Sequence, residues 1–124
     1  MTTIADKLQS VRARIAQACA AAGRAPDSVA LLAVSKTFGA DAVHAAALAG
    51  QCCFGENYIQ EAVEKIAQVA ALGLPQPLEW HCIGPVQSNK TRLVAEHFDW
   101  VHTVDRLKTA QRLSEQRPAH LPPL

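Results

Sequence analysis

One lysine in this chain stands where an amine can do chemistry. Lys36 follows the apolar run 29–34, which is typical of a strand buried on both faces in a parallel sheet. The carboxyl ends of such strands form the mouth of an α/β fold, where ligands collect. A partly desolvated amine at this place can form a Schiff base with an aldehyde. On this pattern alone, a surface lysine that pairs with a carboxylate remains the alternative.

Two further polar residues belong to the next predicted strands. Asn57 lies where the second strand meets its helix, so its amide can either cap that helix or hydrogen-bond the oxygen of a bound ring. His81 alternates with Trp80 and Cys82 along the third strand. A histidine on an inward face could tune the protonation of a bound ring, whereas a hydrogen-bonded core histidine is the simpler interpretation.

Two other clusters are weaker candidates. Segment 87–90 offers amide and hydroxyl donors at a predicted helix start, a natural anion site, unless Ser88 is only a cap and Lys90 faces solvent. One more set of residues could in principle bind a metal: His81, Cys52, Cys53 and Cys82. Their spacing matches no zinc pattern and they fall inside apolar strands, so we expect no metal site. No residue is predicted to be catalytic.

The elements that must position these residues alternate between strand and helix. Apolar residues recur every three or four positions from Ile4 to Cys19, and Thr3 and Gly23 can cap this first helix. The remaining pattern predicts strands at about 29–34, 52–54, 78–83 and 100–104, followed by helices at about 41–49, 57–72, 88–97 and 105–116. Such alternation indicates an α/β fold with parallel strands and right-handed crossovers. An open doubly wound sheet and part of a (β/α) barrel both fit.

Composition excludes several classes of function. The chain has 124 residues, enough for one domain, with 49% hydrophobic and 19% charged residues. A formal net charge of +1 gives no sign of a nucleic-acid or membrane surface. The four cysteines show no framework spacing, so we expect reduced thiols and a cytoplasmic location.

Four segments, taken in order, closely resemble the pyridoxal phosphate homeostasis protein family: LLAVSKT (31–37), FGENYIQE (54–61), WHCIGPVQSNK (80–90) and HTVD (102–105). The resemblance extends over essentially all 124 residues. It implies a single (β/α)8 barrel like the N-terminal domain of alanine racemases. It also implies that a lysine at the end of the first strand holds pyridoxal 5′-phosphate as an aldimine. By motif position this lysine is Lys36, and Asn57 and His81 would contact the same cofactor.

The resemblance further implies a function in intracellular pyridoxal phosphate homeostasis. The protein would bind the cofactor rather than turn over a substrate, and its partners would be cofactor-dependent client enzymes. The full-length protein would be a monomer. The alternative is a racemase-like enzyme that acts through the same aldimine, which would need a second proton-transfer residue on the opposite ring face.

The same resemblance implies that residues 1–124 are the first half of the barrel domain. The expected C-terminal half, with the Ser/Gly-rich loop that holds the cofactor phosphate, would then be lacking, and an inert truncated fragment is a third hypothesis. Half a barrel leaves its first and fourth strands as open edges. We therefore predict that the isolated chain self-associates or aggregates.

Overall fold

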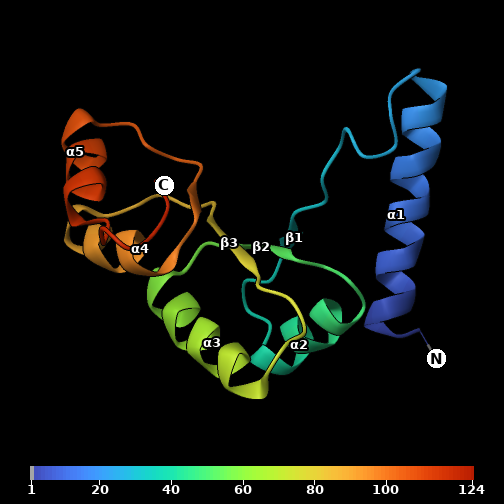
Figure 1. The fold of residues 1–124 in the computed structure, drawn as a ribbon, viewed down its shortest axis with the longest axis horizontal. Coiled ribbons are helices and arrows are strands. Elements are labelled where there is room, and N and C mark those ends of the chain that lie inside the picture. The colour runs from blue at the N-terminus through green and yellow to red at the C-terminus, as the bar shows by residue number, and fades with distance from the viewer. Residues whose placement is uncertain (1) are drawn as a thin grey trace.

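The computed structural model describes residues 2–124 and shows strands alternating with helices (Figure 1). The elements, in chain order, are α1 (Ile4–Ala21), β1 (Ala33–Val34), α2 (Ala40–Leu48), β2 (Cys53–Glu56), α3 (Ile59–Leu72), β3 (Glu79–Cys82), the short 3₁₀ turn η1 (Ser88–Lys90), α4 (Thr91–His97), β4 (Trp100–Val101) and α5 (Leu107–Gln116). Within this described part, no helix is long and apolar enough to cross a bilayer.

The strand order decides between the two architectures that the sequence left open. Over residues 2–124 the sheet has four parallel strands in the order β1-β2-β3-β4, so each strand pairs with the next one along the chain. Successive helices also pack on one another, α1 on α2 and so on to α5, and form one continuous row beside the sheet (Figure 1). A doubly wound sheet reverses its strand order and carries helices on both faces. The arrangement is therefore the arc of a (β/α) barrel.

The two faces of the sheet differ in their side chains. Phe54 and Trp80 point toward the helices, where their ring centroids lie 5.6 Å apart in the hydrophobic core. The core is completed from the helices, chiefly by Val43, Ala62, Val69, Val94, Phe98 and Leu113. The opposite face, here called the inner face, is turned away from the described helices. Parallel strands alternate their side chains between these faces, so the inner face receives every second residue.

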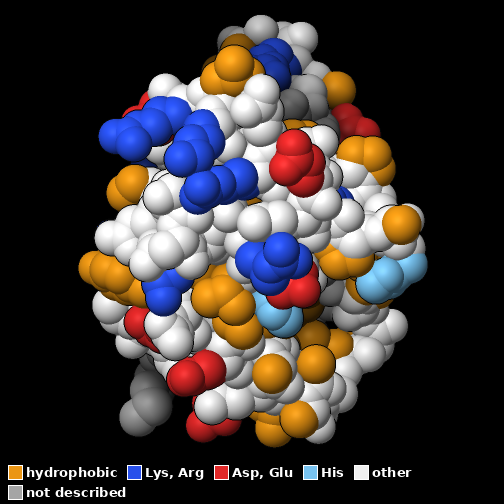
Figure 2. Space-filling view, turned by 90° about the vertical axis from the view of Figure 1, so that its left-hand side faces the viewer, with side chains coloured by type: hydrophobic (Ala, Val, Ile, Leu, Met, Phe, Trp, Pro, Cys, Tyr) orange, Lys and Arg blue, Asp and Glu red, His pale blue; other side chains and the backbone are white. Residues whose placement is uncertain are grey.

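The solvent side of α4 and α5 has the mixed character of an ordinary outer surface. Figure 2 shows Lys and Arg side chains gathered in its upper part, with acidic and single hydrophobic side chains spread over the remainder. Scattered apolar side chains of this kind are normal on a folded domain.

The first strand is shorter than the sequence predicts. Only Ala33 and Val34 pair with β2, and the prediction of a strand over 29–34 buried on both faces is wrong. Among the described strands β1 has β2 as its single neighbour, because it lies at an edge of the sheet. Val34 is consequently 49% exposed. An apolar run is thus evidence for a strand but does not show that both faces are covered.

The helix ends are only partly as predicted. Thr3 and Asp6 form a reciprocal capping box at the start of α1, and Gly23 adopts a φ of 69° after its end, so both of those predictions are confirmed. Asn57 and Ser88 do not cap the later helices as predicted, since Tyr58 and Lys90 occupy the N-cap positions of α3 and α4 and neither makes a side-chain cap bond in the described structure. Tertiary contacts determine these ends more than local polar residues do.

Candidate functional site at the carboxyl ends of the strands

Lys36 lies at the carboxyl end of β1, and its side chain is exposed. The residue before it, Ser35, is buried and extends the ladder by donating its N–H to the Gly55 carbonyl at 2.9 Å. The residue after it, Thr37, has a φ of 66°, which is uncommon for a β-branched residue. The Lys36 amine is thus exposed, whereas the backbone of the residues on either side of it, Ser35 and Thr37, is restricted.

A buried ion pair supports the backbone behind Lys36. The Glu56 side chain is fully buried at the end of β2, and the Lys65 ammonium from α3 lies 2.9 and 3.1 Å from its two carboxylate oxygens. The Ser35 hydroxyl donates to the same carboxylate. Lys65 also donates to the Ser35 carbonyl at 2.7 Å. Charged groups this deeply buried are stable only when they are paired and hydrogen-bonded, as these are.

A second carboxylate extends this network to the other side of Lys36. Glu61 accepts a 3.2 Å hydrogen bond from the Thr37 N–H and lies 3.3 Å from the Lys65 ammonium. The residues before and after Lys36 are therefore both anchored to α3. We call Ser35, Glu56, Glu61 and Lys65 the anchoring network. Within residues 2–124 the Lys36 amine is not part of this network, so it is not needed to hold the backbone.

Sequence reasoning missed Glu56 and Lys65, although one signal was present. The most apolar spacing in this helix predicts a buried stripe through Ile59, Val63, Ile66 and Ala70, but the residues that α3 buries are Ile59, Ala62, Lys65 and Val69. A buried stripe at this spacing places a lysine toward the sheet. Glu56, in the segment 54–61, is the acidic residue that could pair with this lysine.

Asn57 follows β2 at the same edge of the sheet as Lys36. It does not cap α3, and its Oδ1 atom is buried without a hydrogen-bond partner within residues 2–124. The glycine at position 84 allows the Asn57 backbone to approach closely, because a Cβ on Gly84 would lie 3.1 Å from the Asn57 carbonyl oxygen and 3.2 Å from its Cα. Buried polar atoms nearly always have partners, so this orphan oxygen is a candidate ligand contact.

His81 lies on the inner face, deeper in the sheet than Lys36. The register aligns Val34, Gly55, His81 and Trp100 in one row across the four strands. Lys36 and Asn57 are each two residues beyond this row, toward the mouth. Both His81 ring nitrogens are engaged: Nε2 donates to Glu79 at 2.7 Å, and Nδ1 is hydrogen-bonded to Nε2 of His102 at 2.9 Å. The structure thus places His81 in the floor of the site.

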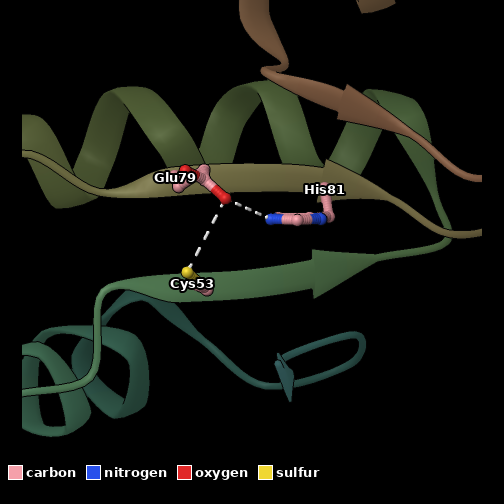
Figure 3. Close-up of side chains that lie close together, drawn as sticks. All are labelled: Cys53, Glu79 and His81. Atoms are coloured by element: carbon pink, nitrogen blue, oxygen red, sulfur yellow. Dashed lines mark hydrogen bonds and ion pairs between the residues drawn. The ribbon is translucent and has the colours of Figure 1, made fainter. Parts of the chain in front are cut away.

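Glu79 connects His81 to a cysteine on the neighbouring strand (Figure 3). The Cys53 thiol donates to the Glu79 carboxylate at a sulfur–oxygen distance of 3.7 Å. Burial, the Cys52 thiol and the Glu79 carboxylate together raise the pKa of the Cys53 thiol to about 12. Cys82 is buried on the helix side and donates to the Gly84 carbonyl, so the four-residue metal set considered from the sequence does not come together.

The segment 87–90 is less open to an anion than the sequence suggested. Ser88–Lys90 forms η1 rather than the first turn of an α-helix, and the Ser88 side chain does not cap it. Lys90 donates to the Gln60 side chain at 3.1 Å, and the Ser88 carbonyl accepts from Arg112. Asn89 remains exposed. These contacts give the segment a structural function at the junction of α3, α4 and α5.

The sequence model of the alanine racemase N-terminal domain family matches residues 7–124. The chain belongs to this family. Its expected fold is confirmed, because the observed arc is the first part of that family's (β/α) barrel.

The resemblance to pyridoxal phosphate homeostasis proteins is also confirmed. The chain is 64% identical over 124 residues to the protein of that name from Pseudomonas aeruginosa and 58% identical to the one from Escherichia coli K12. These matches cover all of this sequence but only 52% and 53% of the two relatives, so the chain spans about half the length of these curated relatives. A solved structure described as PipY of Synechococcus elongatus with PLP bound is 43% identical, with a TM-score of 0.75. That match covers 92% of this chain and 48% of PipY.

Proposed function

We propose that this chain binds pyridoxal 5′-phosphate through Lys36 and serves in intracellular pyridoxal phosphate homeostasis. The observation that carries the proposal is the exposed Lys36 amine on a backbone anchored on both sides, at the mouth of a fold shared with a relative solved with PLP bound. The cofactor supplies an aldehyde, and the Lys36 amine would bind it as a Schiff base with loss of one water molecule.

Asn57 fits the cofactor ring. Its buried Oδ1 lacks a partner in the described chain, and the pyridoxal ring carries a hydroxyl that can donate to it. The backbone of Asn57 lies close to Gly84, where a Cβ would come within 3.1 Å of the Asn57 carbonyl oxygen. In this proposal Asn57 orients the ring by one hydrogen bond, and His81 lies beneath it as part of the floor. Both His81 nitrogens are already bonded, so we assign it no proton transfer.

A carrier function accounts for the described residues better than racemisation does. Two-base racemisation needs a second proton-transfer group on the opposite face of the ring. In residues 2–124, the acids and the amine next to Lys36 are Glu56, Glu61 and Lys65, and they pair with one another. We therefore propose reversible storage and delivery of a reactive aldehyde, with cofactor-dependent enzymes as recipients.

The test is a titration of the chain with pyridoxal phosphate, followed by visible absorption. We expect a Schiff-base band in the wild type, no such band in Lys36→Ala, and an unchanged band in Lys108→Ala, which removes an exposed amine from α5. A band of equal size in wild type and Lys36→Ala, or none in either, would overturn binding through Lys36.

A further inference from the structure

We propose that Cys53, Glu79 and His81 form a binding site for a divalent cation of the Zn²⁺ class on the inner face of the sheet. The three side chains come from the adjacent strands β2 and β3 and point toward one another (Figure 3). Their ligand atoms, one sulfur, one oxygen and one nitrogen, all lie within 4.8 Å of each other.

The spacing of these atoms suits a tetrahedral ion. Zinc bonds of about 2.3 Å to sulfur and about 2.1 Å to oxygen or nitrogen place a sulfur and an oxygen ligand about 3.6 Å apart. The observed distance from the Cys53 sulfur to the Glu79 oxygen is 3.7 Å. The Glu79 oxygen and the His81 Nε2 are 2.7 Å apart and would separate by about 0.7 Å to admit the ion. Glu79 is half-exposed at its side chain and free to make this shift.

The register explains why these residues meet. Cys53 pairs with Glu79, and His81 lies two residues further along β3 on the same face. A two-residue step along a strand is about 6.6 Å, which a histidine ring and a glutamate side chain can bridge. The sheet therefore brings the three ligands together without any loop, so the site has a rigid frame.

His102 provides the outer support that metal-bound histidines usually have. In proteins the ring nitrogen that does not bind the metal is commonly hydrogen-bonded, which sets the tautomer and the ring orientation. The His81 Nδ1 atom is 2.9 Å from Nε2 of His102, and the His81 ring stacks at 4° on Trp100 with a centroid distance of 5.7 Å. Nε2 is thereby directed toward Glu79 and Cys53.

The chemistry of the donors selects the ion. A thiolate, an imidazole and a carboxylate together suit Zn²⁺, whereas Mg²⁺ and Ca²⁺ require mostly oxygen ligands. The Cys53 thiol now donates its proton to the Glu79 carboxylate, and this proton would be released when a cation binds. The proton on His81 would then lie on Nδ1, where Nε2 of His102 can accept it, and His81 Nε2 would be free to bind the ion. Three protein ligands leave a fourth position for water, as in zinc sites that are not purely structural.

The proposed metal site shares His81 with the floor of the proposed cofactor site but extends from it in the opposite direction along the strands. Cys53 and Glu79 lie two residues before the row of Gly55 and His81, whereas Lys36 lies two residues beyond that row. The metal would occupy the amino-terminal side of His81 and the cofactor the mouth side. Metal binding should therefore survive Lys36→Ala, and its test is independent of the cofactor proposal.

The experiment is a Co²⁺ titration of the reduced 124-residue chain in oxygen-free buffer, followed by Zn²⁺ displacement. We expect a thiolate-to-cobalt charge-transfer band that saturates at one equivalent and disappears when Zn²⁺ is added. The band should be lost in Cys53→Ala, weakened at least tenfold in affinity in Glu79→Gln and in His81→Gln, and kept in Cys52→Ala. Cys52 is the matched control because it is an exposed thiol next in sequence, 4.0 Å from the Cys53 sulfur.

Several results would overturn the site. These are absence of the band in the wild type, its persistence in Cys53→Ala, and its loss in Cys52→Ala alone. Far-ultraviolet circular dichroism of each variant shows whether it is folded. If Cys53→Ala is unfolded, Glu79→Gln, which keeps the side-chain shape, decides the outcome: unchanged cobalt affinity in that folded variant contradicts the proposal.

Discussion

Lys65→Met removes the cation from the buried pair behind Lys36 and tests whether the anchoring network holds this part of the fold. Lys65 is 3% exposed and Glu56 is 0% exposed, so the substitution leaves a carboxylate with little access to water. Glu56 would keep the Ser35 hydroxyl as a partner but lose both bonds from the ammonium. The Ser35 carbonyl would lose its 2.7 Å bond as well.

The magnitude follows from this burial. Breaking a buried ion pair by removing one partner costs about 3–5 kcal/mol in free energy of unfolding. Methionine retains most of the lysine stem volume, so loss of packing adds little to this value. Domains are commonly stable by about 5–15 kcal/mol, and the loss would therefore be a large share of the total.

The measurement is urea unfolding followed by tryptophan fluorescence, to which the buried Trp80 and the exposed Trp100 both contribute, with circular dichroism as a second probe. We expect the double variant Lys65→Met/Glu56→Leu to be more stable than Lys65→Met, because it leaves no buried charge without a partner. Lys108→Met, on the exposed side of α5, should change stability by no more than about 0.5 kcal/mol. A loss below about 1 kcal/mol in Lys65→Met would refute the account of a buried network.

Three further predictions concern other parts of the chain. Gly84→Ala places a Cβ 3.1 Å from the Asn57 carbonyl oxygen, so we expect a loss of about 1–3 kcal/mol in urea unfolding and weaker pyridoxal phosphate binding, and an unchanged stability would contradict the close packing. The pKa of the Cys53 thiol is raised to about 12, so its thiolate is scarce at pH 8. Iodoacetamide should therefore alkylate Cys53 (measured in Cys52→Ala) more slowly than Cys52 (measured in Cys53→Ala) at pH 8, and the Cys53 rate should rise as the pH approaches 12. Equal rates of the two thiols at pH 8 would count against the raised pKa. Because β1 and β4 are the edges of the described sheet and Val34 and Trp100 are 49% and 55% exposed, analytical ultracentrifugation should show self-association that Val34→Lys reduces, whereas a monodisperse monomer with a cooperative melting transition would disprove it.

The sequence predicted the elements better than their ends. Helix α1 has a self-contained signal, since its apolar spacing, the Thr3 capping box and Gly23 all lie within the helix or directly beside it. Asn57 does not cap α3, and its backbone lies close to Gly84, a residue far away in sequence. Local patterns cannot reveal such contacts.

The candidate site shows the same division. Lys36 was predictable because its position depends only on the end of one strand. The pairing of Glu56 with Lys65 was not, because it depends on how α3 is rotated against the sheet, and the expected stripe was displaced by one residue from Ile66 to Lys65. Strand order likewise needed the structure, since both barrel and doubly wound folds share the same strand–helix alternation.

The central claim, that Lys36 is the covalent attachment point for pyridoxal phosphate, is tested most directly by trapping the bond. The chain is incubated with the cofactor, reduced with borohydride, digested and mapped by mass spectrometry. We expect one dominant modified peptide, carrying phosphopyridoxyl on Lys36, and strongly reduced labelling in Lys65→Met, where the backbone on either side of Lys36 loses its anchor. Labelling spread evenly over Lys7, Lys36, Lys90 and Lys108 would contradict the claim.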